Sequence, residues 1–497
     1  MTKFRPRTSG MTLNRTGMLA SLALFAMLAG CTLAPTYERP AAPMPTTFEA
    51  APEGAGVASP ALSSLTALTP APSADADWAE VFTDPGLQGL IRKALSQNRD
   101  LRLASLRVQE ARALYGIEAA NLLPSVQAGG TFGRQRYAGT SDGNGGTTGN
   151  YVANDLRATL GVSAFELDFF GRVRSLKDAA LNEYLASEEA QRAAQVSLVA
   201  EVATSYIGLV ALSEQINYAR EVLAAREEGI RVIRLRAERG LVDDLDLNTE
   251  TTQVEVARAA LAERERQRSQ VVHALQVLTG DVSTRPVSAA TLDDAFVVPV
   301  AAGLPSSLLM RRPDIRRAEA QLRATNANIG AARAAFFPSI KLTTDIGTAS
   351  TRFADLFGAG SGVWSFVPQI TVPIFDGGRN IQGLNLAEVR KEMAVVTYEQ
   401  TIQTAFAEVD DALAAQSQLA RQFQAQKRVS DGERERLRLA KRRYMNGVAS
   451  YLELLDAQRS EFQAAQQLID VKQRVLVNHV ALYRALGGGW EPEPSAS

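Results

Sequence analysis

The sequence predicts an α+β membrane protein in which short β-hairpins alternate with very long helical hairpins. Three observations predict this fold: the proline-free, helical runs 173–239 and 380–446, the alternating apolar and polar residues after Pro124 and Pro338, and an internal repetition of the whole arrangement. At 1.5 Å per residue each long run would reach roughly 100 Å. Helices of that length cannot fit a compact globule, so we expect an elongated assembly.

The first thirty residues are typical of a secretion signal. Four basic residues precede the apolar run 18–29, which is too short to span a bilayer. The run ends in Leu28-Ala29-Gly30-Cys31, which is similar to the lipobox of bacterial lipoproteins and predicts a lipid (palmitate) on Cys31, the sole cysteine. An ordinary signal peptide is the alternative. Three residues remain open as the start of translation: Met1, Met11 and Met18.

The residues after the signal predict a tether and then an ordered domain. Cleavage after residue 30 leaves 49 basic and 54 acidic residues, a net charge of −5. Segment 31–77 is rich in proline and is expected to be a lipidated, extended tether. Structure is expected to begin near Trp78, and Asp84-Pro85 predicts the start of a helix. Thr32 after the cysteine favours the outer membrane in the bacterial sorting pattern.

The ordered part of the sequence contains an internal repeat. Phe170-Gly171-Arg172 corresponds to Gly377-Gly378-Arg379, and Gly240 corresponds to Gly447, both at an offset of 207 residues. The predicted organisation is a first repeat at 78–280 (β-hairpin about 125–169, helical hairpin 172–280), an equatorial linker at 281–310, a second repeat at 311–485 (β-hairpin about 339–376, helical hairpin 378–485) and a tail at 486–497. The extra length of the first copy lies in the Gly-rich segment 140–150, which predicts a flexible loop.

The strand segments alternate in a way that fits the wall of a transmembrane barrel. Leu156, Ala158, Leu160, Val162 and Ala164 are expected on one face, with polar or small residues between them. A water-soluble hairpin with one buried face would alternate equally well. Four strands cannot close a barrel, and open sheet edges are not tolerated in lipid, so one chain needs partners. Three copies would give twelve strands, enough to close a barrel.

The long helices are expected to pack as coiled coils. Small and apolar residues recur at steps of three and four from Ala193 to Val210. Gly240 and Gly447 end the two long helices, and return helices are expected at 241–279 and 448–485. No stretch after the signal approaches eighteen apolar residues, so no transmembrane helix is expected.

The composition argues against an enzyme and against a nucleic-acid partner. Basic and acidic residues are balanced at 53 and 54, so there is no electrostatic attraction to nucleic acid. His273 and His479 are the only histidines, and both lie in helical patterns. Together with the single cysteine they exclude a zinc cluster, and no nucleophile elbow or phosphate loop occurs. We expect no metal and no cofactor other than the lipid on Cys31.

Several motifs occur in a fixed order: the lipobox, DPxLxxLI, LPS and FPS at the strand starts, FFGR and GGR, LPSSLLMRRPDIRRAEAQLRATNANIGAARAAFFPSI, and YMNGVASYLELLDAQR. Together they resemble the outer-membrane efflux channel family (TolC-like outer membrane factors), most nearly the OprM/NodT-type lipoprotein branch of tripartite resistance-nodulation-division (RND) pumps. The resemblance covers nearly all of the chain from residue 78. It implies a homotrimer with a twelve-stranded transmembrane barrel, a periplasmic α-helical tunnel and a small mixed equatorial region, in the outer membrane of a Gram-negative bacterium.

The same resemblance implies a function in multidrug resistance. The chain would be a passive exit duct for drugs or other small molecules, served by a periplasmic adaptor (membrane fusion) protein and an inner-membrane RND transporter. A type I protein-secretion outlet or a metal-efflux outlet would share this fold. A lipid-anchored periplasmic coiled-coil scaffold without a pore is the alternative from another class. Neither the exported substrates nor the particular transporter and adaptor can be read from the sequence.

The helix turns are the candidate functional site. The residues expected to dock the adaptor are Gly240, Leu241, Val242, Gly447, Val448 and Ala449. Carboxylates follow each turn, and in a trimer they would form rings that pair with arginines to hold a gate. The arginines close enough in sequence to be their partners are Arg236, Arg239, Arg442, Arg443 and Arg459. The resemblance implies a closed constriction at Leu452 and Asp456; the other candidate gate residues are Glu453, Asp243, Asp244 and Asp246. These acids could instead merely complement a helix dipole. The tip arginine of the TolC pattern is replaced by Ala449.

Overall fold

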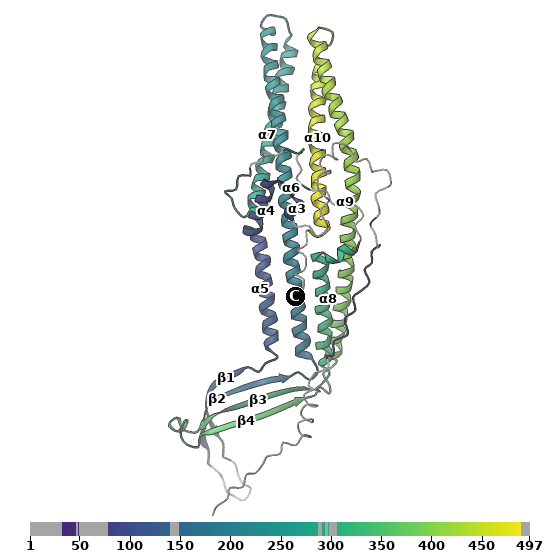
Figure 1. The fold of residues 1–497 in the computed structure, drawn as a ribbon. Coiled ribbons are helices and arrows are strands. Elements are labelled where there is room, and N and C mark those ends of the chain that lie inside the picture. Colours follow the sequence, from purple (N-terminus) through teal and green to yellow (C-terminus); the bar gives the residue numbers. More distant parts are fainter. Residues whose placement is uncertain are drawn as a thin grey trace, which may run out of the picture. The chain divides into compact units, whose positions relative to one another are not determined.

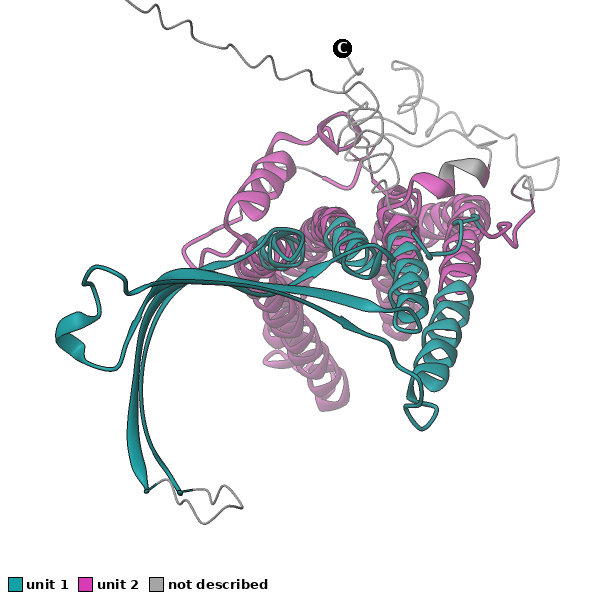
Figure 2. Cartoon of the chain, turned by 90° about the horizontal axis from the view of Figure 1, so that it is seen from below, with its two compact units in different colours: residues 1–39, 109–185, 320–396 teal, residues 40–108, 186–319, 397–497 magenta. Residues whose placement is uncertain are grey.

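The computed structural model describes residues 32–45, 48, 78–139, 149–286, 291–293, 297 and 306–488. They form two compact units, which are described separately (Figure 2). Unit 1 comprises residues 1–39, 109–185 and 320–396, and unit 2 comprises residues 40–108, 186–319 and 397–497. The predicted signal peptide, Cys31, most of the tether, most of the loop at 140–150 and most of the tail lie outside the described residues.

Unit 1 contains one antiparallel sheet of four strands (Figure 1). The strands are β1 (Val126–Tyr137), β2 (Tyr151–Leu167), β3 (Ser339–Ser350) and β4 (Gly362–Thr371), and a short 3-10 helix, η2 (Phe353–Asp355), lies between β3 and β4. The spatial order is β1-β2-β3-β4, so β2 and β3 join the two hairpins and β1 and β4 are the edges. Both edges therefore present backbone groups that pair with no strand of the described chain.

The two faces of the sheet differ in polarity. One face carries large apolar side chains, which the strand pairing places in rows across the sheet, among them Phe132, Leu156, Leu160, Ile346 and Trp364. Most of these side chains are exposed in the single chain. The opposite face carries small and polar residues, among them Gln127, Asp155, Arg157, Thr159, Lys341, Asp345 and Ser365. An exposed apolar face opposite a polar one is the pattern of a membrane-facing barrel wall.

Two glycines on the polar face allow the strands to curve. A Cβ atom at Gly161 would overlap the carbonyl oxygen of Thr344 and lie 2.7 Å from Cα of Asp345; a Cβ at Gly347 would overlap the carbonyl oxygen of Ala158. Crowding of this kind on one face is expected where that face is concave. The four strands bend together (Figure 2), and glycine is the residue that permits such a bend.

A β-bulge corrects one expectation about β2. The pairing of β2 with β3 shifts register between Val162 and Phe165, and Ala164 takes a positive φ of 53°. Phe165 consequently pairs with Leu342 and continues the apolar face. Ala164 was expected on that face, and this expectation is wrong because the extra residue of a bulge reverses the alternation after it.

Four helices run into unit 1: α5 (Arg99–Ala120), α6 (Arg172–Ala237), α8 (Pro313–Ala334) and α9 (Arg379–Met445). Phe170, after β2, stacks on Phe337, before β3, with 4.8 Å between ring centroids, and Tyr115 of α5 stacks on Tyr184 of α6 at 6.5 Å. Stacked aromatic pairs stabilise such contacts beyond their buried area. The Phe170–Phe337 pair lies where the strands join the helices.

Unit 2 is helical. It adds α3 (Trp78–Val81), α4 (Pro85–Gln97), α7 (Asp244–Thr279), the 3-10 helix η1 (Ser306–Arg311) and α10 (Tyr451–Ala485), so that α6 with α7 and α9 with α10 form two long hairpins (Figure 1). As Asp84-Pro85 predicts, Asp84 caps α4 by accepting a hydrogen bond from the N–H of Leu87 (2.7 Å), with proline in the first turn.

The core of unit 2 corrects the expectation that no segment is apolar enough to cross a membrane. Helix α6 contains an 18-residue window that passes this test by length and composition, but 61% of the window is buried in the structure. Residues such as Val202, Ala203 and Ile207 pack there against α4, α7 and α10. The window is accounted for as the core of the helical unit.

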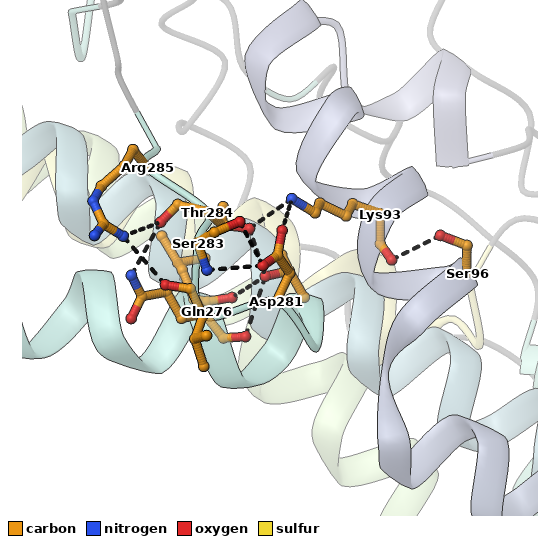
Figure 3. Close-up of polar contacts among 10 residues, drawn as sticks. Lys93, Ser96, Gln276, Asp281, Ser283, Thr284 and Arg285 are labelled. Carbon is orange, nitrogen blue, oxygen red and sulfur yellow. Dashed lines mark hydrogen bonds and ion pairs between the residues drawn. The ribbon is translucent and has the colours of Figure 1, made fainter.

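A polar cluster ties α4 to the end of α7 (Figure 3). The Lys93 ammonium forms an ion pair with Asp281 (2.5 Å) and donates to Thr284 Oγ1 (2.8 Å), and Gln276 donates to the carbonyl of Thr284 (3.1 Å). The hydrogen bonds from Lys93 and Ser283 lower the pKa of Asp281 below its ordinary value. The first residues of the predicted linker 281–310 therefore belong to the helical unit.

The start of the predicted tether is bound to the protein. Residues 32–45 are extended, yet several of them are half-buried. Asn326 and Arg333 of α8 donate to the carbonyl groups of Pro35 and Leu33 at 2.7 and 3.4 Å. These residues are extended, as expected of a tether, but they also bind α8, because backbone carbonyls of an extended, proline-rich chain are available to side-chain donors.

His479 predicts a loss of stability in acid. It is 8% exposed on α10, and burial lowers its pKa to about 4, so the folded protein keeps it neutral while the unfolded chain protonates it below pH 6.5. Stability contributed by this site is therefore lost as the pH falls from about 6.5 to 4, by up to about 3 kcal/mol. Melting of the His479→Leu variant should depend less on pH over this range than melting of the parent. The exposed His273 supplies the control, since His273→Leu should retain the parent's pH dependence.

Candidate functional site

Both helical hairpins of unit 2 end in the same turn. In the first, the N–H of Gly240 donates to the carbonyl three residues back and the N–H of Leu241 to the carbonyl five residues back, each at 2.9 Å. Gly447 and Val448 repeat these two bonds in the second turn, at 3.0 and 2.9 Å. Both glycines have a φ of +71°. This is the Schellman motif, in which glycine takes the left-handed conformation that stops a helix.

The predicted docking residues lie at these turns. Leu241 and Val448 are about 70% exposed, at 71% and 69%, and Val242 and Ala449 are half-buried. Large apolar side chains held in solvent by rigid turns offer contact surface without backbone rearrangement. The turns can therefore receive another helical element.

The acids after the first turn cap a helix. Asp243 precedes α7 and accepts a hydrogen bond from the N–H of Asp246 (2.9 Å), and Asp244 and Asp246 lie in the first helical turn. Negative charge at this end complements the helix dipole. Arg236 and Arg239 were considered as partners, but no ion pair joins them to these three acids in the described part of the chain.

The acids after the second turn form ion pairs. Ser450 caps α10 by accepting from the N–H of Glu453 (3.3 Å), and the Glu453 carboxylate pairs with Arg443 at 3.3 Å. Leu452 precedes Glu453 in the sequence, and its side chain is 75% exposed. An exposed leucine beside paired charges in the first turn of α10 fits a constriction that other chains would complete.

Asp456 is held by two arginines. Arg436 of α9 binds one carboxylate oxygen, and Arg459 of α10 binds the other at 2.9 Å. The hydrogen bond from Arg436 is the largest cause that lowers the pKa of Asp456. Arg459 was among the expected partners, but Arg436 was not, because it lies twenty residues earlier on the facing helix.

A second link, between the two hairpins, was not anticipated. The hydroxyl of Tyr451, the first residue of α10, donates to Glu250 of α7. Glu250 is only 3% exposed, and buried Arg226 of α6 acts on the tyrosine electrostatically. Burial, followed by the bond to Glu250, raises the pKa of Tyr451, so the phenol stays protonated and remains a donor. This hydrogen bond therefore links the second hairpin to the first, close to the turns.

A similar link lies further along the hairpins. The hydroxyl of Tyr218 on α6 donates to Glu461 of α10, and its ring stacks on Phe462 with 5.9 Å between centroids. Gln215 of α6 donates to Asp470 at 2.7 Å. Buried tyrosine–carboxylate bonds of this kind are strong and cost free energy to break. They hold the two hairpins in a defined arrangement.

The site contains ion pairs, capped helix ends and exposed apolar tips. No group of three metal-ligating side chains that could hold an ion was found among the described residues. A sheet with one exposed apolar face and two open edges, attached to long helical hairpins with charged ends, defines the class of protein: a subunit of a membrane channel.

The chain belongs to the outer membrane efflux protein family. The model of that family, described as outer membrane efflux protein, matches residues 90–281 and 304–488. The family assignment agrees with the resemblance seen in the sequence motifs. It places the protein in the outer membrane.

Known relatives match over almost the whole chain. The chain is 44% identical to the antibiotic efflux pump outer membrane protein ArpC of Pseudomonas putida, over 96% of each chain. It is 41% identical to the cation efflux system protein CusC of Escherichia coli, over 93% of this chain and 97% of the relative. Among solved structures, the open state of the MtrE outer membrane channel of Neisseria gonorrhoeae has a TM-score of 0.79 at 38% identity, covering 92% of this chain and 98% of that one.

Proposed function

We propose that the chain is one of three identical subunits forming the outer-membrane exit duct of a tripartite efflux pump. The observation that carries the proposal is the sheet of unit 1, which has an apolar face and two unpaired edge strands. Neither edge is tolerated in lipid, so further copies must pair with it. Three copies of four strands give a closed barrel of twelve, with the polar face inside.

Two exposed apolar stripes support pairing between copies. Leu114 and Ile117 lie on one face of α5, which leads into the edge strand β1. A second stripe lies on α9, which follows the edge strand β4, and comprises Leu386, Val389, Met393 and Val396. Pairing β1 of one copy with β4 of the next brings the two stripes together, which buries both. The two hairpins of each copy end in equivalent turns, which supports an internally duplicated subunit. The helices of the three copies would form a tunnel that continues the barrel.

Access to the duct is proposed to be controlled at the hairpin turns. Leu452 and Asp456 would line the constriction, with Glu453 and the acids of the first turn adding rings of negative charge around it. The duct is passive, because the transport work is done by a partner in the inner membrane. Opening would separate the second hairpin from the first.

The proposal is tested by purifying the lipidated protein from the outer-membrane fraction and reconstituting it in planar bilayers. The mass corrected for detergent should equal three chains, and the trimer should conduct. Leu452→Ala combined with Asp456→Ala should raise single-channel conductance several-fold, because it removes the apolar plug and the anchor for Arg436 and Arg459. A monomer would support the lipid-anchored scaffold instead, and unchanged conductance would contradict the gate.

The partners would be a periplasmic adaptor (membrane fusion) protein and an inner-membrane RND transporter. We propose that the adaptor binds the two exposed turns. Leu241→Glu combined with Val448→Glu should reduce drug export roughly tenfold or more, because a central apolar contact is lost. The trimer should persist, because neither substitution alters a glycine of the turns. Growth of the variant in drug is compared with that of Val256→Glu, a change at another exposed apolar residue further along α7. Wild-type resistance of the double variant would argue against docking here.

Drugs or other small molecules are the proposed cargo. The relative named for antibiotic efflux is 44% identical and the one named for cation efflux 41% identical, so both kinds of pump use a similar outlet. The transporter upstream would select the cargo. We further propose that Cys31 carries a lipid that anchors the mature chain.

A further inference from the structure

One face of helix α8 holds the segment that follows Cys31. The face comprises Arg323, Asn326, Gly330 and Arg333, spaced so that they lie along one side of the helix. Asn326 Nδ2 donates to the carbonyl of Pro35 (2.7 Å), and Arg333 Nη1 donates to that of Leu33 (3.4 Å). The guanidinium of Arg323 lies 5.0 Å from the ring centroid of Tyr37.

Gly330 lies in the middle of this face, which is the seat of the segment. A Cβ atom there would lie 2.8 Å from both Cα and Cβ of Ala34 and 2.6 Å from Oγ of Ser175 on α6. Ser175 is 1% exposed, so it cannot withdraw into solvent. The segment therefore packs against α8 only because the helix has no side chain at this position.

The segment runs antiparallel to α8 and ends near the sheet. Tyr37 lies at Arg323, whereas Leu33 lies at Arg333, in the last turn of the helix. Strand β3 begins at Ser339, a few residues later. Leu33 is thereby held where the helix passes into the membrane-facing strand.

We infer that this face of α8 is a docking site for the chain's own acylated amino terminus, and that docking fixes the level at which the lipid enters the membrane relative to the sheet. The inference rests on the proposed lipidation of Cys31. In this inference, α8 binds the lipid-bearing segment, and Gly330 is the residue that makes room for it.

Chain geometry shows how tightly docking would restrict the lipid. Leu33 lies two positions after Cys31, a reach of about 7 Å at most. If the seat were empty, the chain would still be held further along, where Ala42 and Met44 pack against the core that α9 and α10 share. Ala42 lies eleven positions from Cys31. A flexible segment of that length has a root-mean-square span of about 20 Å. Docking therefore confines the anchor to the level of the strand starts.

Two variants of the full-length protein separate docking from anchor placement. Gly330→Leu should empty the seat, and chymotrypsin should then cut after Tyr37 at least tenfold faster than in the parent. A ten-residue Gly/Ser insertion between Thr32 and Leu33 should leave cutting at Tyr37 unchanged, because the seat stays occupied. Both variants should slow the appearance of heat-resistant trimer in the outer membrane several-fold. The matched controls are Gly383→Leu, where a Cβ meets nothing within 4 Å, and the same insertion between Ser63 and Ser64; neither should change cutting or assembly.

The outcomes distinguish the possibilities. Parental cutting of Gly330→Leu would show that the seat does not hold the segment. Parental assembly of the Thr32–Leu33 insertion would show that the segment docks without setting the position of the anchor. Either result overturns the inference and leaves the exit duct untouched. A mature mass without lipid on Cys31 overturns the lipidation and the placement of the anchor together, and the channel reconstitution still reports on the duct.

Discussion

The Gly161→Val variant is expected to lose the assembled barrel, with less than about a tenth of the parent's heat-resistant trimer remaining. A Cβ at this position would overlap the carbonyl oxygen of Thr344 and lie 2.7 Å from Cα and Cβ of Asp345. These neighbours are mainly backbone atoms of β3, so no rotamer change can relieve the clash. Strands β2 and β3 would have to separate, and several ladder hydrogen bonds of about 0.5–1.5 kcal/mol each would be lost in addition to about 1–3 kcal/mol of overpacking.

Gly129→Val is the matched control. Gly129 lies on the same face, in β1, paired with Thr159, but a Cβ there meets nothing within 4 Å. Valine favours strands, so this variant should assemble like the parent. Trimer is measured as the heat-resistant band from isolated outer membranes and as mass in detergent. Normal trimer from Gly161→Val would mean that the curvature of the sheet does not depend on this glycine.

The strands could be predicted from the sequence, but their curvature could not. The alternation from Leu156 to Val162 identified β2, and the prolines at 124 and 338 marked the starts of both hairpins. The clash at Gly161 depends on β3, which is about 180 residues away in the chain and reaches it only through the register of the sheet. At the bulge the large apolar residues change from even positions, ending at Val162, to odd positions, beginning at Phe165. The alternation was extended past this change to Ala164, so the position of that residue was predicted wrongly.

The same limit applies to the candidate site. Gly240 and Gly447 predicted both turns, because a Schellman motif depends on neighbouring residues. The links from Tyr451 to Glu250 and from Tyr218 to Glu461 join residues more than 200 positions apart. Glu250 lies in a polar helix and has the pattern of a surface residue. Its burial depends on how one hairpin is aligned with the other, which periodicity within each hairpin does not determine.

The Tyr451→Phe variant is expected to open the duct without breaking the trimer. Phenylalanine keeps the packing of the ring against Tyr444, whose centroid is 5.5 Å away, but removes the donor to Glu250. A carboxylate that is 3% exposed is then left without this partner in the closed state. Such a group costs about 1–3 kcal/mol, which shifts the closed-to-open ratio by roughly 5- to 150-fold. Single-channel recordings should therefore show a large rise in open probability.

A double-mutant cycle assigns this effect to the pair. In a Glu250→Leu background, Tyr451→Phe should change the open probability little, because no buried carboxylate remains to lose its hydrogen-bond donor. Tyr444→Phe is the control: it removes a hydroxyl from the adjacent ring and leaves the bond to Glu250 intact, so its channel should gate like the parent. If Tyr451→Phe and Glu250→Leu were additive, the two residues would act separately and the bond would not be the link that holds the hairpins closed. Coupling confined to this pair would locate the control of opening between the hairpins, close to the proposed constriction at Leu452 and Asp456, because that constriction is proposed to widen only when α10 is free to leave α7.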